Sequence, residues 1–142
     1  MSQISRQALL EEINKHEWYQ RISLGDGVVT PGETDDTSEK KLTMMNLPDS
    51  LVGKSVLDIG CNEGFFAFEA ERRGAAPILA IDASNRAEKK FELVKRALNS
   101  MIKFERKDLM DISPEKHGTF ELVFFLAVYH HVRHPFAVID HL

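Results

Sequence analysis

The stretch Ser55–Gly64, SVLDIGCNEG, decides the fold of this 142-residue chain. A short apolar run carries an acidic residue, Asp58, near its end and then breaks into a turn with a glycine at each side. A second apolar run, ILAID, also ends on an acid, Asp82. A buried strand, a tight turn and a helix N-terminus make a concave pocket with backbone N–H groups pointing into it. Because an acid at the end of the next strand can accept hydrogen bonds from a ribose diol, the pattern predicts a nucleoside-cofactor site.

The sequence around this stretch alternates strand-like and helix-like segments. We expect strands at Ser55–Ile59, Pro77–Ile81, Met101–Glu105 and Glu121–Val128, and helices at Gly64–Arg73 and Asn85–Asn99. Three of the four strands have nearly continuous apolar cores, which is typical of strands covered by helices on both faces. Right-handed crossovers then give a three-layer parallel sheet. The sequence predicts an α/β fold with a Rossmann-like, doubly wound parallel sheet over residues 48–142.

Residues 1–47 are expected to form an N-terminal extension. Apolar side chains at loose helical spacing predict a helix within residues 5–21. The following segment, Leu24–Asp36, is dense in turn-forming residues and contains one brief extended piece, Val28-Val29. A polar link through Glu39–Lys41 then leads into the sheet.

Composition limits the class of protein. Hydrophobic residues make up 43% of the chain and charged residues 28%, which is ordinary for a soluble globular domain. The net charge of −4 gives no general attraction to nucleic acid. The single cysteine, Cys61, excludes an internal disulfide framework and suits a reducing compartment. No signal sequence or membrane-spanning apolar run is present, so we expect a cytoplasmic protein with no membrane partner.

The last predicted strand has no partner on its far side. It is strongly apolar, and the segment after it, Pro135–Leu142, begins a helical pattern and then stops. An open edge of this kind invites pairing with another chain. Two explanations stand: the chain is the front half of a larger domain, incomplete at the C-terminal side, or a second copy or partner chain pairs with this edge. We favour the first.

The sequence of the turn after the first strand distinguishes between two families of nucleotide-binding proteins. A dinucleotide fingerprint needs G-x-G-x-x-G, and G-C-N-E-G does not match it. The turn resembles that of class I S-adenosylmethionine (SAM) methyltransferases, which carry an acid two residues before the first glycine and then G-x-G-x-G. Asn62 stands where the middle glycine would be, and asparagine tolerates a left-handed backbone better than most residues.

This resemblance implies a set of cofactor contacts. The turn, at Gly60, Cys61, Asn62 and Gly64, would pack against the methionine part of SAM, and Asp58 would help to orient it. Asp82 would hold the ribose hydroxyls, Ala83 would lie beside the adenine, and Asp108 would accept from the adenine amino group. Two neighbours have other expected roles: Cys61 is first a small turn residue, whose thiol pKa a helix N-terminus could lower, and Glu63 is a first-turn acid that complements the helix dipole.

Three further segments resemble one methyltransferase family more closely. They are HEWYQRISLGDGVVTPG, GFFAFEAERRGA and AVYHHVRHP, and the family is related to enzymes that complete 5-oxyacetyl or 5-methoxy uridine at the tRNA wobble position. The resemblance implies methyl transfer to a small molecule or to a tRNA, with SAM as cofactor and carboxy-SAM left open. It also implies that Trp18, Tyr19 and the loop after them cover the cofactor cleft. The other interpretation is that Trp18 and Tyr19 pin the leading helix to the core, and the two interpretations are compatible.

Candidate catalytic residues follow the last strand. Tyr129 and His130 come just after its carboxyl end, where ligands bind in open parallel sheets. If the acceptor is a hydroxyl, His130 could take its proton; otherwise both side chains pack against the cofactor or close the loop. The histidines also suggest a metal site as an alternative, since His130 and His134 are four residues apart. Pro135 disfavours one continuous helix there, and no carboxylate or cysteine stands at ligand spacing, so we predict no metal.

Two rival functions belong to other classes. The chain could be a truncated, catalytically silent module that binds a nucleoside, or a partner chain, through the edge of its last strand. A nicotinamide-dependent enzyme is disfavoured because the dinucleotide fingerprint is absent.

Overall fold

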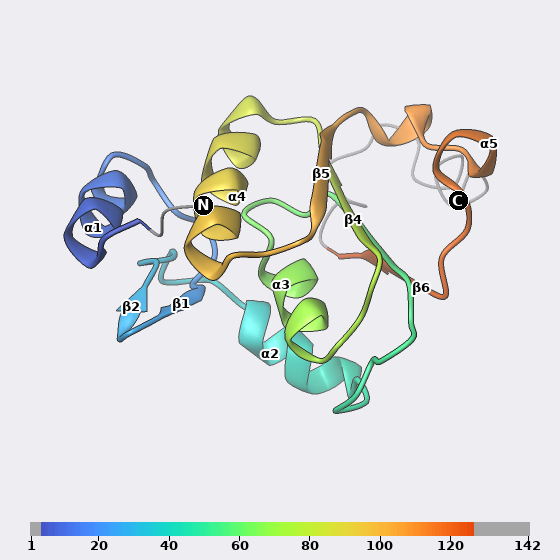
Figure 1. Cartoon of the computed structure of the whole chain (residues 1–142), viewed down its shortest axis with the longest axis horizontal. Helices are drawn as coiled ribbons and strands as arrows, with labels where there is room; N and C mark the ends of the chain where they lie inside the picture. Colours follow the sequence, from blue (N-terminus) through green and yellow to red (C-terminus); the bar gives the residue numbers. More distant parts are fainter. Residues whose placement is uncertain (1–3, 127–142) are drawn as a thin grey trace.

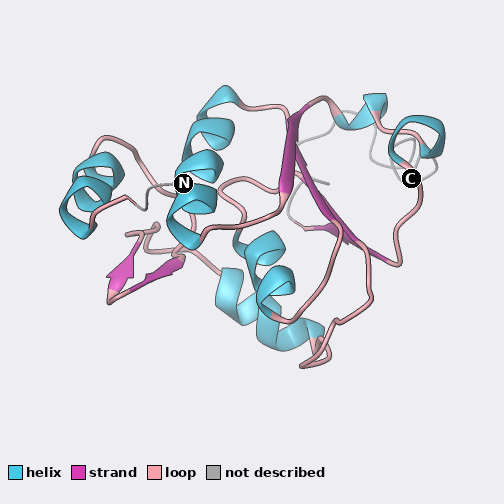
Figure 2. Cartoon of the chain, viewed as in Figure 1, coloured by secondary structure: helices cyan, strands magenta, loops and turns pink. Residues whose placement is uncertain are grey.

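The computed structural model describes residues 4–126, and its parallel sheet forms the centre of an α/β fold (Figures 1 and 2). The elements, in chain order, are α1 (Arg6–Asn14), β1 (Ser23–Gly25), β2 (Val28–Val29), α2 (Ser38–Met45), β3 (Val56–Ile59), α3 (Phe65–Arg72), β4 (Ile78–Asp82), α4 (Asn85–Leu98), β5 (Lys103–Arg106), the short 3₁₀ helix η1 (Leu109–Asp111), α5 (Pro114–His117) and β6 (Leu122–Phe125). Within this range no helix is long and apolar enough to cross a membrane.

The main sheet has the strand order β5-β4-β3-β6, and every pairing in it is parallel. All four residues of β3 are buried, and four of the five residues of β4 are buried. Near-continuous burial of this kind explains why both strands read as unbroken apolar runs. The predicted Rossmann-like parallel sheet is confirmed.

The two faces of the sheet differ in what covers them. In Figure 1, α3 and α4 lie to the left of the sheet, while α5 lies to the right. Val56, Ala80 and Phe124 join the large core on the side of α3 and α4. On the other face, Leu57 and Ile81 belong to a small second core. Side chains alternate between these cores because successive residues of a strand point to opposite faces.

The N-terminal extension shares the large core with the sheet. Leu9 and Ile13 of α1, Trp18, and Val28 of β2 are buried in the same cluster as the helices α3 and α4. Apolar burial of this kind contributes roughly 1.5–3 kcal/mol for each large side chain. The extension is therefore packed against the sheet domain by its own hydrophobic residues.

Two stretches differ from the expected secondary structure. The link through Glu39–Lys41 is part of a helix, α2, and the Asp36 carboxylate accepts hydrogen bonds from the backbone N–H and hydroxyl of Ser38 as this helix begins. The strand that the sequence predicts at Met101–Glu105 is β5, and it begins two residues later than predicted, at Lys103. The N–H of Met101 donates to Glu71 and the N–H of Ile102 donates to the Ser100 hydroxyl, so neither is left for the sheet.

Gly64 joins the turn after β3 to α3 at a position that only glycine fits. Its φ of 102° lies in the left-handed region. A Cβ added there would meet the rings of Phe68 and Phe91 at 2.5 and 2.6 Å. Both rings are buried and stacked on each other, with centroids 4.8 Å apart, so neither can retreat.

We therefore expect Gly64→Ala to lower the free energy of unfolding by about 2–5 kcal/mol, from overpacking and from the left-handed backbone together. Gly53→Ala is the matched control, because its φ is 79° but no atom lies within 4 Å of the added Cβ. That variant should lose only the backbone term, about 1–2 kcal/mol. Urea unfolding measures both, and equal losses would contradict the close approach of the two rings.

Candidate functional site

A cavity of about 650 Å³ opens at the carboxyl ends of β3 and β4. The ends of these strands supply Asp58, Gly60 and Asn62, then Asp82, Ala83 and Ser84, and the loop after β5 supplies Lys107, Asp108 and Leu109. The N-terminal extension closes another side with Tyr19, Gln20, Ser38 and Lys41. Ligands bind at this end of open parallel sheets. The cavity is thus the candidate site.

Three carboxylates from separate segments meet at this cavity. Asp58 lies on β3, Asp82 ends β4, and Asp108 follows β5, and all three line the same hollow. The parallel order β5-β4-β3 brings them together, because the carboxyl ends of parallel strands share one edge of the sheet. The structure therefore assembles the three aspartates that the sequence singled out.

Asp58 is buried without a full set of partners. Its side chain is 2% exposed, and within residues 4–126 its Oδ2 has no hydrogen-bond partner. Burial, and next the negative charge of Asp82, raise the pKa of Asp58 to about 8, against a hydrogen bond from the backbone N–H of Ala67. Burial disfavours the charged form. Asp58 is consequently protonated at neutral pH, and its Oδ2 faces no hydrogen-bond partner among the described residues.

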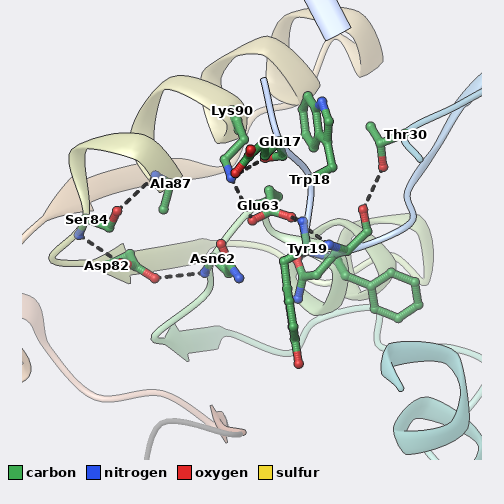
Figure 3. A network of polar contacts seen from close by, with 12 residues as sticks. Glu17, Trp18, Tyr19, Thr30, Asn62, Glu63, Asp82, Ser84, Ala87 and Lys90 are labelled. Carbon is green, nitrogen blue, oxygen red and sulfur yellow. Dashed lines mark hydrogen bonds and ion pairs between the residues drawn. The ribbon is translucent and has the colours of Figure 1, made fainter. Parts of the chain in front are cut away.

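Asp82 is fixed by two backbone N–H groups. Its Oδ2 accepts from Asn62 and its Oδ1 from Ser84, both at 2.9 Å (Figure 3). Each carboxylate oxygen can accept a second hydrogen bond, so Asp82 is held in place with acceptor capacity left over. Asn62 reaches it through a left-handed backbone with a φ of 52°. This is the conformation that the sequence required of the residue standing in place of a glycine.

The turn does not direct its N–H groups into the cavity as the sequence suggested. The N–H groups of Gly60 and Cys61 both donate to the carbonyl oxygen of Ile81, at 2.8 and 3.1 Å. The N–H of Gly64 donates to Cys61, and that of Asn62 to Asp82. The expectation was wrong for these four groups because the β3–β4 pairing takes up the first two, the turn itself takes up that of Gly64, and the Asp82 side chain takes up that of Asn62. The turn therefore offers no free N–H group at these four positions for a phosphate, and the aspartates beside it suit hydroxyl groups and cations.

Cys61 and Gly64 are not among the residues that line the cavity. The Cys61 side chain is 2% exposed and belongs to the large core. Burial, followed by the charges of Asp58 and Asp82, raises the pKa of its thiol well above its usual range. The alternative of a thiol with a lowered pKa is wrong, because burial outweighs the nearby helix N-terminus.

The remaining expected contacts divide into two groups. Ala83 and Asp108 are exposed and line the cavity, and Asp108 also accepts a hydrogen bond from the N–H of Met110 at the start of η1. Tyr129 and His130 lie outside the described residues, and so does His134, the second histidine considered for a metal site. Within residues 4–126 no group of His, Cys, Asp and Glu side chains is arranged to hold a metal ion.

Glu63 was expected to complement the dipole of α3, and the structure gives it another role. It precedes the N-cap residue Gly64, and its fully buried side chain turns to the N-terminal extension. One oxygen accepts from the N–H groups of Tyr19 and Gln20, and the other lies 3.4 Å from Nζ of Lys90 (Figure 3). Sequence reasoning missed this link because its partners lie more than twenty residues away in the chain.

The two interpretations of Trp18 and Tyr19 both hold in part. Trp18 is 4% exposed and donates from its indole nitrogen to the carbonyl of Ile13, which pins α1 to the core. Its neighbour Tyr19 lines the cavity. The extension is therefore both packed into the core and part of the site.

Comparison with known proteins agrees with this geometry. A protein family described as "Methyltransferase domain" matches residues 36–142. The tRNA U34 carboxymethyltransferase of Helicobacter hepaticus is 31% identical over 88 residues, which are 58% of this chain and 28% of that protein. That of Campylobacter jejuni subsp. doylei is 28% identical over 111 residues, or 75% of this chain and 38% of that protein. The chain thus spans about a third of the length of these relatives.

Solved structures show the same fold. The N-terminal domain of EvdMO1, solved in the presence of SAH and D-fucose, covers 98% of this chain and 60% of its own with a TM-score of 0.78 at 16% identity. An S-adenosylmethionine dependent methyltransferase from Mesorhizobium loti is 25% identical, with a TM-score of 0.56 over 75% of this chain and 48% of its own. This chain belongs to the methyltransferase domain family and is related to the tRNA U34 carboxymethyltransferases.

Proposed function

We propose that this chain binds SAM in the cavity and acts as a SAM-dependent methyltransferase. The observation that carries the proposal is the buried carboxyl of Asp58, whose Oδ2 has no hydrogen-bond partner among the described residues, beside the fixed carboxylate of Asp82. A buried acid without a donor is costly unless a ligand supplies one. SAM carries an ammonium group, a sulfonium cation and two ribose hydroxyls, which are the groups that such a pair of acids can take.

The residues present fit the parts of this cofactor. Asp82 has acceptor capacity for the ribose diol, and Asp58 lies deeper, where it would orient the methionine part. Ala83 offers a small exposed surface beside the adenine, and Asp108 would accept from the adenine amino group. Gly60 and Asn62 line the cavity and complete the turn; Cys61 and Gly64 would act through the shape of that turn.

When bound, SAM supplies an electrophilic methyl group on a sulfonium. The chain's own residues would then align an acceptor atom with that group and keep water away from it. Tyr19 and the wall around it already cover one side of the cavity. Tyr129 and His130 stay proposed for the acceptor side, with His130 as the base if the acceptor is a hydroxyl.

The acceptor of the methyl group is also proposed. The relatives that carry the name tRNA U34 carboxymethyltransferase support a wobble uridine of tRNA, and a small molecule is the alternative. Carboxy-SAM is the alternative cofactor, and the cavity lining includes two cationic side chains, Lys41 and Lys107, that could face its added carboxylate. A cytoplasmic location is proposed on the single cysteine alone.

Calorimetry with SAM, with its demethylated product SAH and with carboxy-SAM tests the proposal. Asp82→Ala should weaken SAH binding by about 1.5–3 kcal/mol, because hydrogen bonds to a charged group contribute that much. This corresponds to a tenfold to hundredfold rise in Kd, in round terms. Asp111→Ala is the control, since Asp111 is exposed and is not among the lining residues. Unchanged affinity of Asp82→Ala would remove the ribose role, and no SAM or SAH binding at millimolar concentration would reject the function.

Binding should also depend on pH through Asp58. Its pKa of about 8 in the free protein means that it is protonated at neutral pH. A cationic ligand favours the ionised form, so SAM affinity should rise roughly tenfold between about pH 6.5 and 7.5, below the pH at which the ligand's own amino group loses its proton, and a proton should be released on binding. Calorimetry in buffers of different ionisation enthalpy measures that proton. Asp58→Asn should abolish the release; a proton release that survives in this variant would assign it to another group.

A second candidate function is a module that binds a nucleoside or a partner chain without catalysis. It is favoured by the outer position of β6, which pairs only with β3 among the described residues, and by Val123 on it, which is 45% exposed. If a second copy pairs with this edge, light scattering after size-exclusion chromatography should give twice the mass of 16.1 kDa at micromolar concentration. A monomer across that range would argue against edge pairing.

A further inference from the structure

We propose that Glu63 is a positioning residue that holds Tyr19 and Gln20 in place as one wall of the cofactor cavity. The proposal rests on the proposed function, in that the ligand is SAM or SAH. It differs from the contacts above because Glu63 is not among the residues that line the cavity. Its effect on the ligand would pass through the N-terminal extension.

The carboxylate of Glu63 accepts hydrogen bonds from the backbone of the N-terminal extension. Its Oε1 accepts from the N–H of Tyr19 at 2.8 Å and from the N–H of Gln20 at 2.7 Å. Its Oε2 lies 3.4 Å from Nζ of Lys90, a side chain that is itself only 12% exposed. Two successive N–H groups converging on one carboxylate oxygen fix both the position and the direction of the chain. Tyr19 and Gln20 are the residues of this segment that line the cavity.

Glu63 stands directly after Asn62, and this connects the wall to the cofactor turn. The N–H of Asn62 donates to Asp82, whereas the side chain of Glu63 accepts from the extension (Figure 3). A single short turn therefore contacts the ribose-binding acid on one side and the cavity wall on the other. Displacement of the wall would be transmitted to the turn through one residue.

Further contacts hold the same segment from two other sides. The Gln20 side chain accepts a hydrogen bond from the N–H of Phe65, where α3 begins, and the Gln20 carbonyl accepts from the buried hydroxyl of Thr30. Nζ of Lys90 donates to the carbonyl of Glu17 at 2.8 Å and lies 5.9 Å from the centre of the Trp18 ring. The wall is thus attached to α3, to α4 and to the loop after β2.

Burial raises the pKa of Glu63, and the N–H groups of Gln20 and Tyr19 and the charge of Lys90 oppose that shift by stabilising the carboxylate. A buried carboxylate is tolerated when hydrogen bonds and a cation compensate it, and removal of the partners leaves an uncompensated charge. If the Tyr19–Gln20 segment moved away, Glu63 would lose both N–H donors while staying buried. The closed position of the wall is therefore favoured, and the cavity is shaped before any ligand enters.

The test compares Glu63→Gln with Lys90→Met and with a control, Glu69→Gln. Glu69 is a carboxylate of α3 that is 15% exposed, pairs with Arg72 and Arg73, and does not line the cofactor cavity. Calorimetry with SAH is done where circular dichroism shows each variant to be folded. We expect Glu63→Gln to weaken SAH binding roughly tenfold or more, Lys90→Met to weaken it less because both N–H bonds remain, and Glu69→Gln to leave it unchanged.

A second measurement needs no ligand. Trp18 is the only tryptophan of the chain and is next to Tyr19, so its fluorescence reports the wall directly. In Glu63→Gln, acrylamide quenching of Trp18 and hydrogen exchange of the Tyr19 and Gln20 amides should increase, while exchange in β3 and β4 stays as in the parent. If the parent binds no SAH, the proposed function fails and this ligand-free comparison still decides the role of Glu63.

Three outcomes would overturn the proposal. The first is a Glu63→Gln variant that is less stable but binds SAH as tightly as the parent, which assigns Glu63 to stability alone. The second is unchanged exchange at Tyr19 and Gln20. The third, where Glu63→Gln does not fold, is a Lys90→Met variant with unchanged Trp18 quenching and unchanged SAH affinity.

Discussion

The pairing of β3 with β4 is the constraint on which the site depends. The ladder does not stop at the last strand residue, because the carbonyl of Ile81 accepts from both Gly60 and Cys61 in the turn. This fixes the turn to the neighbouring strand before any side chain is considered. It sets the left-handed backbone of Asn62, and through the N–H of Asn62 it sets the carboxylate of Asp82. Strand pairing thus determines the arrangement of the acids.

The same pairing also determines what kind of ligand fits. A turn with free N–H groups binds anions, whereas this turn has used four of them within the protein. The groups that remain beside the turn at the cavity are the carboxyl groups of Asp58 and Asp82. Burial, and next the charge of Asp82, raise the pKa of Asp58. Such a site favours ligands with hydroxyl groups and positive charge. The chemistry of the cavity and the family of the chain therefore agree from independent evidence.

Much of this arrangement could be predicted from sequence, and the failures have physical causes. Apolar runs in β3 and β4 and the 3–4 spacing in α4 are local signals, and they located these elements to within one or two residues. Asp58 could be selected because it stands two residues before the first glycine of the turn, and Asp82 and Asp108 because they follow predicted strands. Helix α2 was missed because its polar sequence carries little periodicity. Glu63 was misjudged because its partners, at Tyr19, Gln20 and Lys90, are brought to it only by tertiary packing.

The unequal cores on the two faces of the sheet bear on how such a domain can diverge. The turn after β3 is backed by the large core, where the rings of Phe68 and Phe91 lie against Gly64, so substitutions at that turn are penalised through stability. Asp108 instead stands on an exposed loop over the small core. A substitution of Asp108 would lose the hydrogen bond from the N–H of Met110 but would disturb no buried packing. The end of the cavity next to Gly64 is therefore tied to the packing that keeps the domain folded, whereas the end at Asp108 is less constrained by that packing.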